Sequence, residues 1–272
     1  MKLITFRQGL DTKAGRVQGD EVVELGYKDI GALLNDDWTI QAQSEGPVHS
    51  LDSLDIAPSI LNPSKIICVG HNYGSHVIEQ GLPWPKYPTL FAKFSDSLIG
   101  SYDNLVLPKI SQKMDWEVEL VIVIGKGGRH ISMDEADDYI AGFSVMNDIS
   151  ARDWQFRTGQ FLQGKTFDSC SPLGPLVTKE DLNYQQGLEL RCYVDDLEVQ
   201  RGNTLDLIFS PGELVSYISS FIRLNPGDLI STGTPGGVGH WRQPPMYLQP
   251  GQVLRSWVEG IGELVNPIVA SE

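Results

Sequence analysis

The chain has 272 residues, and its 21 basic against 35 acidic side chains give a formal net charge of −14. This balance argues against a nucleic-acid partner, because binding a phosphate backbone needs a basic surface. No apolar run reaches the roughly 18 residues of a membrane-spanning helix, so we expect no membrane contact. The start, MKLITFRQG, lacks a secretory signal. Three unclustered cysteines fit neither a disulfide framework nor a zinc site, and we expect a cytoplasmic protein.

Two parts of the chain differ in pattern. Short apolar runs separated by turns fill residues 1–30 and predict a small antiparallel sheet. A short helix is expected at 30–38, and the polar, Pro-containing stretch 41–64 reads as a connection. We therefore predict a small N-terminal domain over residues 1–60 and a larger main domain over residues 61–272.

The main domain opens with the strand IICVG (66–70), a turn, and a helix that ends at Glu79. The following GLPWPKYPTLFAKF is too rich in proline to be a regular helix. Helices are predicted at 133–140, with Ser132 as N-cap, and at 212–222. Further strands are predicted at 105–108, 116–124, 142–148, 188–194 and 228–232. With 28 glycines, 16 prolines and no regular strand–helix alternation, the chain predicts an α+β fold that is mainly β.

The stretch DWEVELVIVIG places two glutamates inside an apolar strand. Glu117 and Glu119 are two residues apart and therefore point to one face, where Val121 and Val123 follow. A solvated strand face is the ordinary explanation of such acidic residues, but the two valines weaken it. Burying ionised carboxylates costs several kcal/mol each without compensation. A cation between the two side chains would provide that compensation.

A third oxygen ligand is available in MNDIS, where Asp148 ends another apolar strand. A turn or helix cap would explain this residue equally well. Three carboxylates without His or Cys favour a hard cation, Mg²⁺ or Mn²⁺, with Ca²⁺ as an alternative.

Two further motifs carry groups for catalysis. His76 and Glu79 are three residues apart, so on a helix the carboxylate can orient the imidazole as a general base. A surface helix pair is the competing interpretation. Lys165 in QGKTF and Arg152 in ISARDWQ are either solvated charges or fixed cations for an anionic substrate. His71, directly after a strand, is expected to make only local turn hydrogen bonds.

The glycine-rich run STGTPGGVG follows a predicted strand but matches no nucleotide-binding motif. Its backbone N–H groups and the Thr234 hydroxyl could receive a carboxylate or an oxyanion.

Five segments, taken in order, resemble the fumarylacetoacetate hydrolase family, in particular its bacterial acylpyruvase-like and 2-hydroxyhepta-2,4-diene-1,7-dioate isomerase-like members. The segments read KIICVGHNYGSHVIEQ, DWEVEL with IGK, GFSVMNDISARDWQ, QGKTFDSCSPLGP and LNPGDLISTGTPGGVG, and the resemblance covers roughly residues 64–265. The resemblance implies a mixed β-roll with flanking helices, a homodimer, and bound Mg²⁺ or Mn²⁺.

The same resemblance implies roles for individual residues. Glu117, Glu119 and Asp148 match the metal ligands of the family. His76 and Glu79 match the pair that activates water.

Other matches concern the substrate. Lys165 corresponds to the lysine that contacts substrate and stabilises charge. Thr234, with Gly233 in the same TGTP loop, corresponds to a contact with the carboxylate end of the substrate. Arg152 stands near the metal ligands in a supporting role.

The implied activity is metal-dependent hydrolysis of a C–C bond in a 1,3-diketo acid, such as an acylpyruvate or fumarylpyruvate, through an enolate. Oxaloacetate decarboxylation or tautomerisation and isomerisation of a 2-oxo diacid are alternatives on the same site. A non-catalytic relative is a third class, which the complete set of matching residues disfavours. The stretch WRQPPMYLQPGQ resembles members that act on diketo sugar acids, whereas GLPWPKYPTLF would suit a product of aromatic-ring fission.

Overall fold

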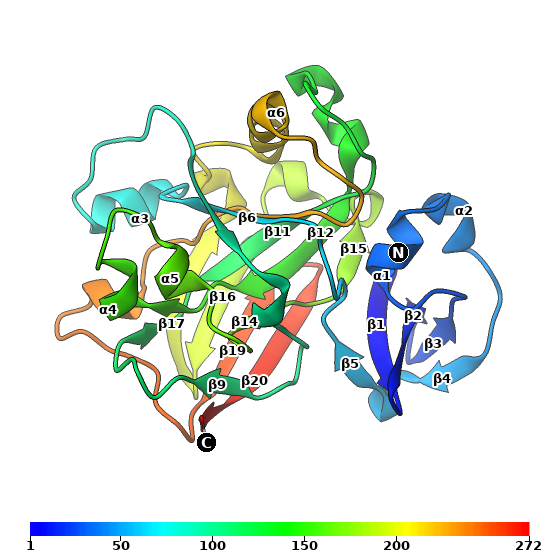
Figure 1. Cartoon of the computed structure of the whole chain (residues 1–272), viewed down its shortest axis with the longest axis horizontal. Coiled ribbons are helices and arrows are strands. Elements are labelled where there is room, and N and C mark those ends of the chain that lie inside the picture. Colours follow the sequence, from blue (N-terminus) through cyan, green and yellow to red (C-terminus); the bar gives the residue numbers. More distant parts are fainter. Residues whose placement is uncertain (272) are drawn as a thin grey trace.

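The computed structural model describes residues 1–271, and two twisted sheets contain most of its strands (Figure 1). The larger sheet has eleven strands in the order β4-β3-β2-β1-β15-β12-β11-β18-β6-β7, with β5 paired to β1. Its strands are β1 (Lys2–Gln8), β2 (Asp11–Gln18), β3 (Glu21–Glu24), β4 (Val48–Ser50), β5 (Asp55–Ala57), β6 (Ile66–Gly70), β7 (Thr89–Lys93), β11 (Val118–Ile124), β12 (Ile140–Asn147), β15 (Leu176–Thr178) and β18 (Leu229–Ser231). The predicted α+β, mainly β fold is confirmed.

The second sheet has five strands in the order β17-β16-β19-β20-β9. They are β9 (Leu105–Leu107), β16 (Glu189–Val194), β17 (Leu197–Asn203), β19 (Val253–Val258) and β20 (Gly262–Ala270). Two short pairs complete the strands: β8 (Leu98–Ile99) with β14 (Ser171–Pro172), and β10 (Met114–Asp115) with β13 (Ser150–Ala151). The α-helices are α1 (Ile30–Leu34), α2 (Trp38–Gln41), α3 (Gly74–Glu79), α4 (Arg152–Gln155), α5 (Leu162–Lys165) and α6 (Pro211–Phe221).

Strand β11 lies in the middle of the larger sheet, between β12 and β18, and all seven of its residues are buried. Its two faces enter different apolar clusters. Leu120 and Ile122 pack in the main cluster, whereas Val121 and Val123 pack in the second one. Burial on both faces explains why this strand reads as a nearly continuous apolar run, and it makes acidic side chains at its start exceptional.

Several predicted boundaries differ from the observed ones. The strand predicted from residue 116 begins at Val118, because the side chain of Asn147 accepts the Glu117 N–H (2.8 Å) in place of a neighbouring backbone. The helix predicted at 133–140 is a 3₁₀ helix. Its expected N-cap, Ser132, donates its hydroxyl to the side chain of Glu135 (2.7 Å) and caps no backbone N–H.

The predicted helix at 30–38 is divided into α1 and α2, and the predicted connection at 41–64 contains the short strands β4 and β5.

The N-terminal strands continue the larger sheet. β1 pairs with β15 through Lys2–Val177 and Leu3–Leu176. The apolar cluster under this junction contains Leu3 and Leu33 together with Val121 of the central strand. The division at residue 60 stays a prediction, and any N-terminal unit shares part of its core with the rest of the chain.

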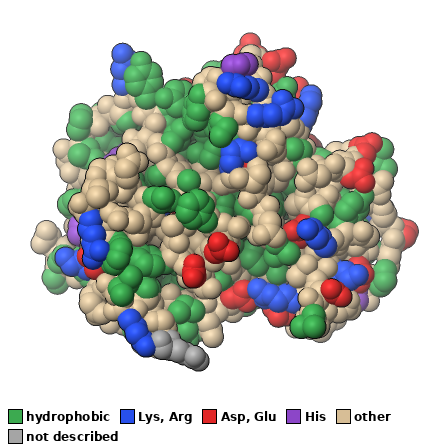
Figure 2. Space-filling view, viewed as in Figure 1, with side chains coloured by type: hydrophobic (Ala, Val, Ile, Leu, Met, Phe, Trp, Pro, Cys, Tyr) green, Lys and Arg blue, Asp and Glu red, His purple; other side chains and the backbone are tan. Residues whose placement is uncertain are grey.

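Helices α3, α4 and α5 lie together on one side of the molecule, away from the N-terminal strands (Figure 1). Hydrophobic side chains gather on the same side of the surface (Figure 2). Ile78 and Trp84, in and just after α3, are exposed there, as is Phe156 after α4. Among residues 1–271, no helix has the length and apolar character that crossing a bilayer requires.

Candidate active site

The antiparallel register of β11 and β12 brings the predicted metal ligands together. Val118 pairs with Asn147, so the next pair along the ladder is Glu117 and Asp148, where the Asp148 N–H donates to the Glu117 carbonyl (2.8 Å). Glu119 lies two residues further along the same face. Oxygen atoms of the three carboxylates lie within 4.8 Å of one another, and all three side chains are buried.

Two buried lysines face this acidic group. Lys165, the last residue of α5, places Nζ 2.6 Å from a Glu117 oxygen and 2.9 Å from an Asp148 oxygen. Lys93, the last residue of β7, places Nζ 2.7 Å from the other Asp148 oxygen. The lysine ammonium groups therefore compensate part of the carboxylate charge, as buried ions require.

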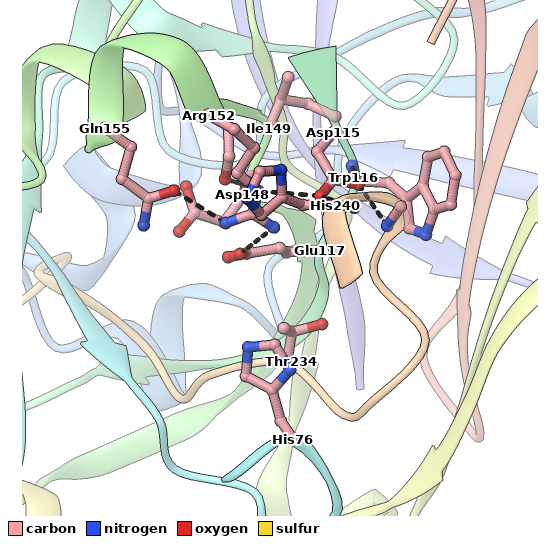
Figure 3. Close-up of polar contacts among 12 residues, drawn as sticks. His76, Asp115, Trp116, Glu117, Asp148, Ile149, Arg152, Gln155, Thr234 and His240 are labelled. Atoms are coloured by element: carbon pink, nitrogen blue, oxygen red, sulfur yellow. Dashed lines mark hydrogen bonds and ion pairs between the residues drawn. The ribbon is translucent and has the colours of Figure 1, made fainter. Parts of the chain in front are cut away.

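Arg152 connects the acidic group to a neighbouring loop (Figure 3). From the first turn of α4, its guanidinium contacts Glu117 (2.7 Å) and Asp115 (2.8 Å) and donates to Gln155 (2.9 Å). Asp115 in turn accepts the backbone N–H of His240 (2.9 Å). The guanidinium is thus in contact with three side chains of the protein, and its predicted supporting role is consistent with holding Glu117 in place.

The four buried carboxylates of this site could all be ionised in charge balance only with a further cation. Four buried carboxylates, those of Asp115, Glu117, Glu119 and Asp148, face only three buried cations, those of Lys93, Arg152 and Lys165. Burial opposes ionisation of Glu117, but Lys165 and Arg152 outweigh it and hold the pKa of that carboxyl below its usual range. For Glu119, burial and then the charges of Asp148 and Glu117 raise the pKa well above the usual range.

These residues fit a hard divalent cation. The triad could bind a metal ion through oxygens only, and the added charge would let Glu119 ionise beside its neighbours. Glu119 is already oriented by the Ser231 hydroxyl and by the Gly233 N–H (2.9 Å).

The predicted base lies across the cleft from Arg152 (Figure 3). His76, on α3, is buried, and its Nδ1 is 3.1 Å from a Glu79 oxygen. The second Glu79 oxygen accepts the Gly237 N–H (3.0 Å). The carboxylate is therefore held from two sides and can orient the imidazole, as a general base requires.

The glycine-rich loop makes contacts other than those expected. The Thr234 hydroxyl donates to the Val118 carbonyl (2.9 Å) and accepts from Gln200 (2.8 Å). Gly233 has a φ of +97°, which favours glycine, and its N–H is used by Glu119. Both residues hold the loop against β11, and their contact with a substrate stays a prediction.

The cleft in front of the triad has an empty volume of about 420 Å³, including space open to solvent. Sequence reasoning missed part of its lining and support: His71, Gln80, Lys93, Asp115, Gln155, Phe161 and Trp241. Three of them have a local signal: Asp115 stands two residues before Glu117, Gln80 four after His76, and Gln155 three after Arg152. His71, expected to make only turn hydrogen bonds, also lines the cleft. The remaining residues come near the triad only through long-range packing.

Comparison with known proteins gives concordant matches. The family model "Fumarylacetoacetate (FAA) hydrolase C-terminal" matches residues 65–269. The mitochondrial oxaloacetate tautomerase FAHD2A of Homo sapiens is 45% identical over 226 residues, which cover 82% of this chain and 72% of the human protein.

Solved structures resemble the whole chain. The 5-carboxymethyl-2-hydroxymuconate delta-isomerase from Mycobacterium smegmatis has a TM-score of 0.85 and 32% identity, with full coverage of both chains. The maleylpyruvate hydrolase from Sphingobium sp. SYK-6, solved with manganese(II) and pyruvate, has a TM-score of 0.84 and 25% identity, again with full coverage. By their names, these relatives catalyse tautomerisation, isomerisation and hydrolysis.

Proposed function

This chain belongs to the fumarylacetoacetate hydrolase family, and from that premise we propose that it interconverts the keto and enol forms of a small 2-oxo acid of the oxaloacetate type. The observation that carries the proposal is a buried carboxylate triad facing an oriented histidine across one cleft. Such an arrangement serves proton transfer next to a carbonyl.

In this proposal Glu117, Glu119 and Asp148 would hold Mg²⁺ or Mn²⁺. The metal would supply Lewis acidity that polarises the 2-oxo group of the substrate. The acidic triad and the manganese of the Sphingobium relative support the metal class.

The protein supplies the proton acceptor. Glu79 accepts the Nδ1 proton of His76, so the lone pair for catalysis is on Nε2. His76 takes the proton from the carbon next to the 2-oxo group through Nε2 and then gives that proton to the carbonyl oxygen, so the keto form becomes the enol with no net change in protons. Lys165 provides a buried positive charge close to the developing negative charge.

Hydrolysis of an acylpyruvate, the activity expected first from the sequence, is the second candidate. It requires His76 to activate water rather than to deprotonate the substrate carbon, and the His76–Glu79 pair suits either task. The 45% identity with an oxaloacetate tautomerase moves tautomerisation ahead of hydrolysis.

A substrate panel separates the candidates. The protein is assayed with Mg²⁺, Mn²⁺ or EDTA for loss of oxaloacetate enol absorbance, for oxaloacetate decarboxylation, and for cleavage of acetylpyruvate and fumarylpyruvate. We expect metal-dependent tautomerisation to be the fastest reaction. Faster cleavage of an acylpyruvate would instead establish a hydrolase, and loss of CO₂ at the rate of enol loss would establish a decarboxylase.

A further inference from the structure

We propose that Gln80 is a positioning residue that covers the reactive nitrogen of His76 in the resting enzyme and moves aside when substrate binds. The inference deepens the proposed function, because it concerns the base assigned there. It starts from a contact between side chains of one helix. Nε2 of His76 lies 2.6 Å from Nε2 of Gln80.

The hydrogen-bonding roles of this contact follow from the opposite side of the ring. Glu79 can only accept at His76 Nδ1, so Nδ1 carries the proton, and in the neutral imidazole Nε2 is an acceptor. The amide nitrogen of Gln80 can only donate. The contact is therefore an N–H of Gln80 donated to the lone pair that would take a proton from substrate or water.

A second histidine, His71, lines the cleft beside this pair. Burial, followed by the charge of His76, lowers the pKa of His71, whereas its contact with Gln80 acts in the opposite direction. The two rings are stacked with centroids 6.3 Å apart, and Phe161 packs on the edge of His71.

The position of Gln80 on the backbone allows it to move. It is the C-terminal cap of α3, and its side chain is half-buried and lines the cleft. Gly81 follows with a φ of +66°, and residues 82–84 after it are exposed. In contrast, Glu79 is fixed by its hydrogen bond from Gly237. The imidazole therefore keeps its tautomer when the Gln80 side chain moves away from Nε2.

The hydrogen bond from Gln80 to Nε2 of His76 can be observed by nitrogen NMR of protein labelled with ¹⁵N-histidine, because the chain has only five histidines. His76→Gln identifies the His76 signals. We expect Nε2 of His76 to have the shift of a hydrogen-bonded acceptor in the resting protein and to move toward that of a free acceptor in Gln80→Met. Ile78→Met, a change at an exposed position of the same helix, should leave it unchanged. Mg²⁺ with oxalate, a planar mimic of a 2-oxo acid enolate, should reproduce the Gln80→Met shift in the wild type.

Kinetics give an independent test. Gln80→Met should lower KM about fivefold with kcat retained, since substrate no longer displaces one hydrogen bond. Gln80→Glu has the same size but only accepts, so it should hold His76 protonated and lower kcat at least about tenfold.

An Nε2 signal that is identical in wild type and Gln80→Met would overturn the proposal, as would a higher KM in Gln80→Met. If no 2-oxo acid is turned over, the proposed function fails, but the NMR comparison still decides whether Gln80 covers His76.

Discussion

Glu119 is the residue whose ionisation depends most on a bound cation. Burial and the carboxylates of Asp148 and Glu117 raise its pKa, whereas Glu117 has Lys165 and Arg152 beside it and a lowered pKa. The two glutamates are on one face of one strand, yet their surroundings give them opposite shifts. A metal ion would remove this difference in pKa, because its positive charge would favour the ionised form of Glu119.

Glu119→Gln should therefore abolish stabilisation by metal without destabilising the metal-free protein. Mg²⁺ at 100 times its dissociation constant should add about 2.7 kcal/mol to the free energy of unfolding of the wild type and nothing to the variant. Thermal unfolding with Mg²⁺ and with EDTA measures both. An equal metal-induced shift in the two proteins would remove Glu119 from the site.

The same substitution should change the dependence of stability on pH in EDTA. A carboxyl with a raised pKa in the folded state stabilises it below the unfolded pKa, about 4.3 for Glu, and this contribution is lost as the pH rises. The stability of Glu119→Gln relative to wild type should thus increase above that pH. A difference that stays constant up to neutral pH would show that Glu119 ionises normally.

Replacing Arg152 shows how much stability is lost when buried carboxylates have no positive partner. Arg152→Met removes the partner of Glu117 and Asp115, and we expect a loss of about 3–5 kcal/mol in urea unfolding. Arg201→Met is the matched control, because the Arg201 side chain is 61% exposed in its pair with Glu189. Its replacement should lower the free energy of unfolding by at most about 1 kcal/mol. Equal losses would mean that the buried pair contributes no more than a surface one.

At the scale of elements, α3 shows how a short helix is made rigid enough to carry a base. It has six residues, too few to be stable alone. Its start is fixed by Asp206, which accepts the Ser75 N–H (2.9 Å), and its end by the contact of Glu79 with Gly237 (3.0 Å). The helix is therefore held by partners far away in the sequence.

Asp206→Ala should lower kcat about fivefold with little change in melting temperature, because it loosens α3 only. Glu213→Ala is the matched control. It removes the capping box of α6 (Ser210 and Glu213) and should cost about 1 kcal/mol of stability without changing kcat. Kinetics and thermal unfolding of both variants check this. Lost stability with intact kcat in Asp206→Ala would show that α3 is positioned by other contacts.

At the scale of the whole molecule, local patterns predicted much of the fold but not the partners of each element. The β11 strand was recognisable because its apolar run is buried on both faces. Its exact start depends on the side chain of Asn147, 30 residues away. Lys93 could not be predicted for the same reason, since only packing brings it to the triad. Gln155 differs, because it follows Arg152 by three residues on α4 and its contact with Arg152 agrees with helical spacing.

The shared core makes a prediction about truncation. Residues 61–272 alone would expose the edge of β15 and lose Leu3, Ile30 and Leu33 from the second apolar cluster. Each fully buried aliphatic side chain contributes about 1.5–3 kcal/mol, so the truncated chain should not unfold cooperatively. Circular dichroism during urea unfolding measures this. A cooperative transition with retained activity would instead establish residues 1–60 as an independent unit.

The central claim is that a metal held by the carboxylate triad and a base on α3 act together on a 2-oxo acid. The rate of oxaloacetate enol loss in a stopped-flow experiment tests it most directly, for the wild type, Glu119→Gln, His76→Gln and the remote control His49→Gln. We predict acceleration with Mg²⁺ in the wild type and His49→Gln, and a loss of at least about 100-fold in the other two variants and in EDTA. Acceleration that persists in EDTA or in His76→Gln would contradict the account.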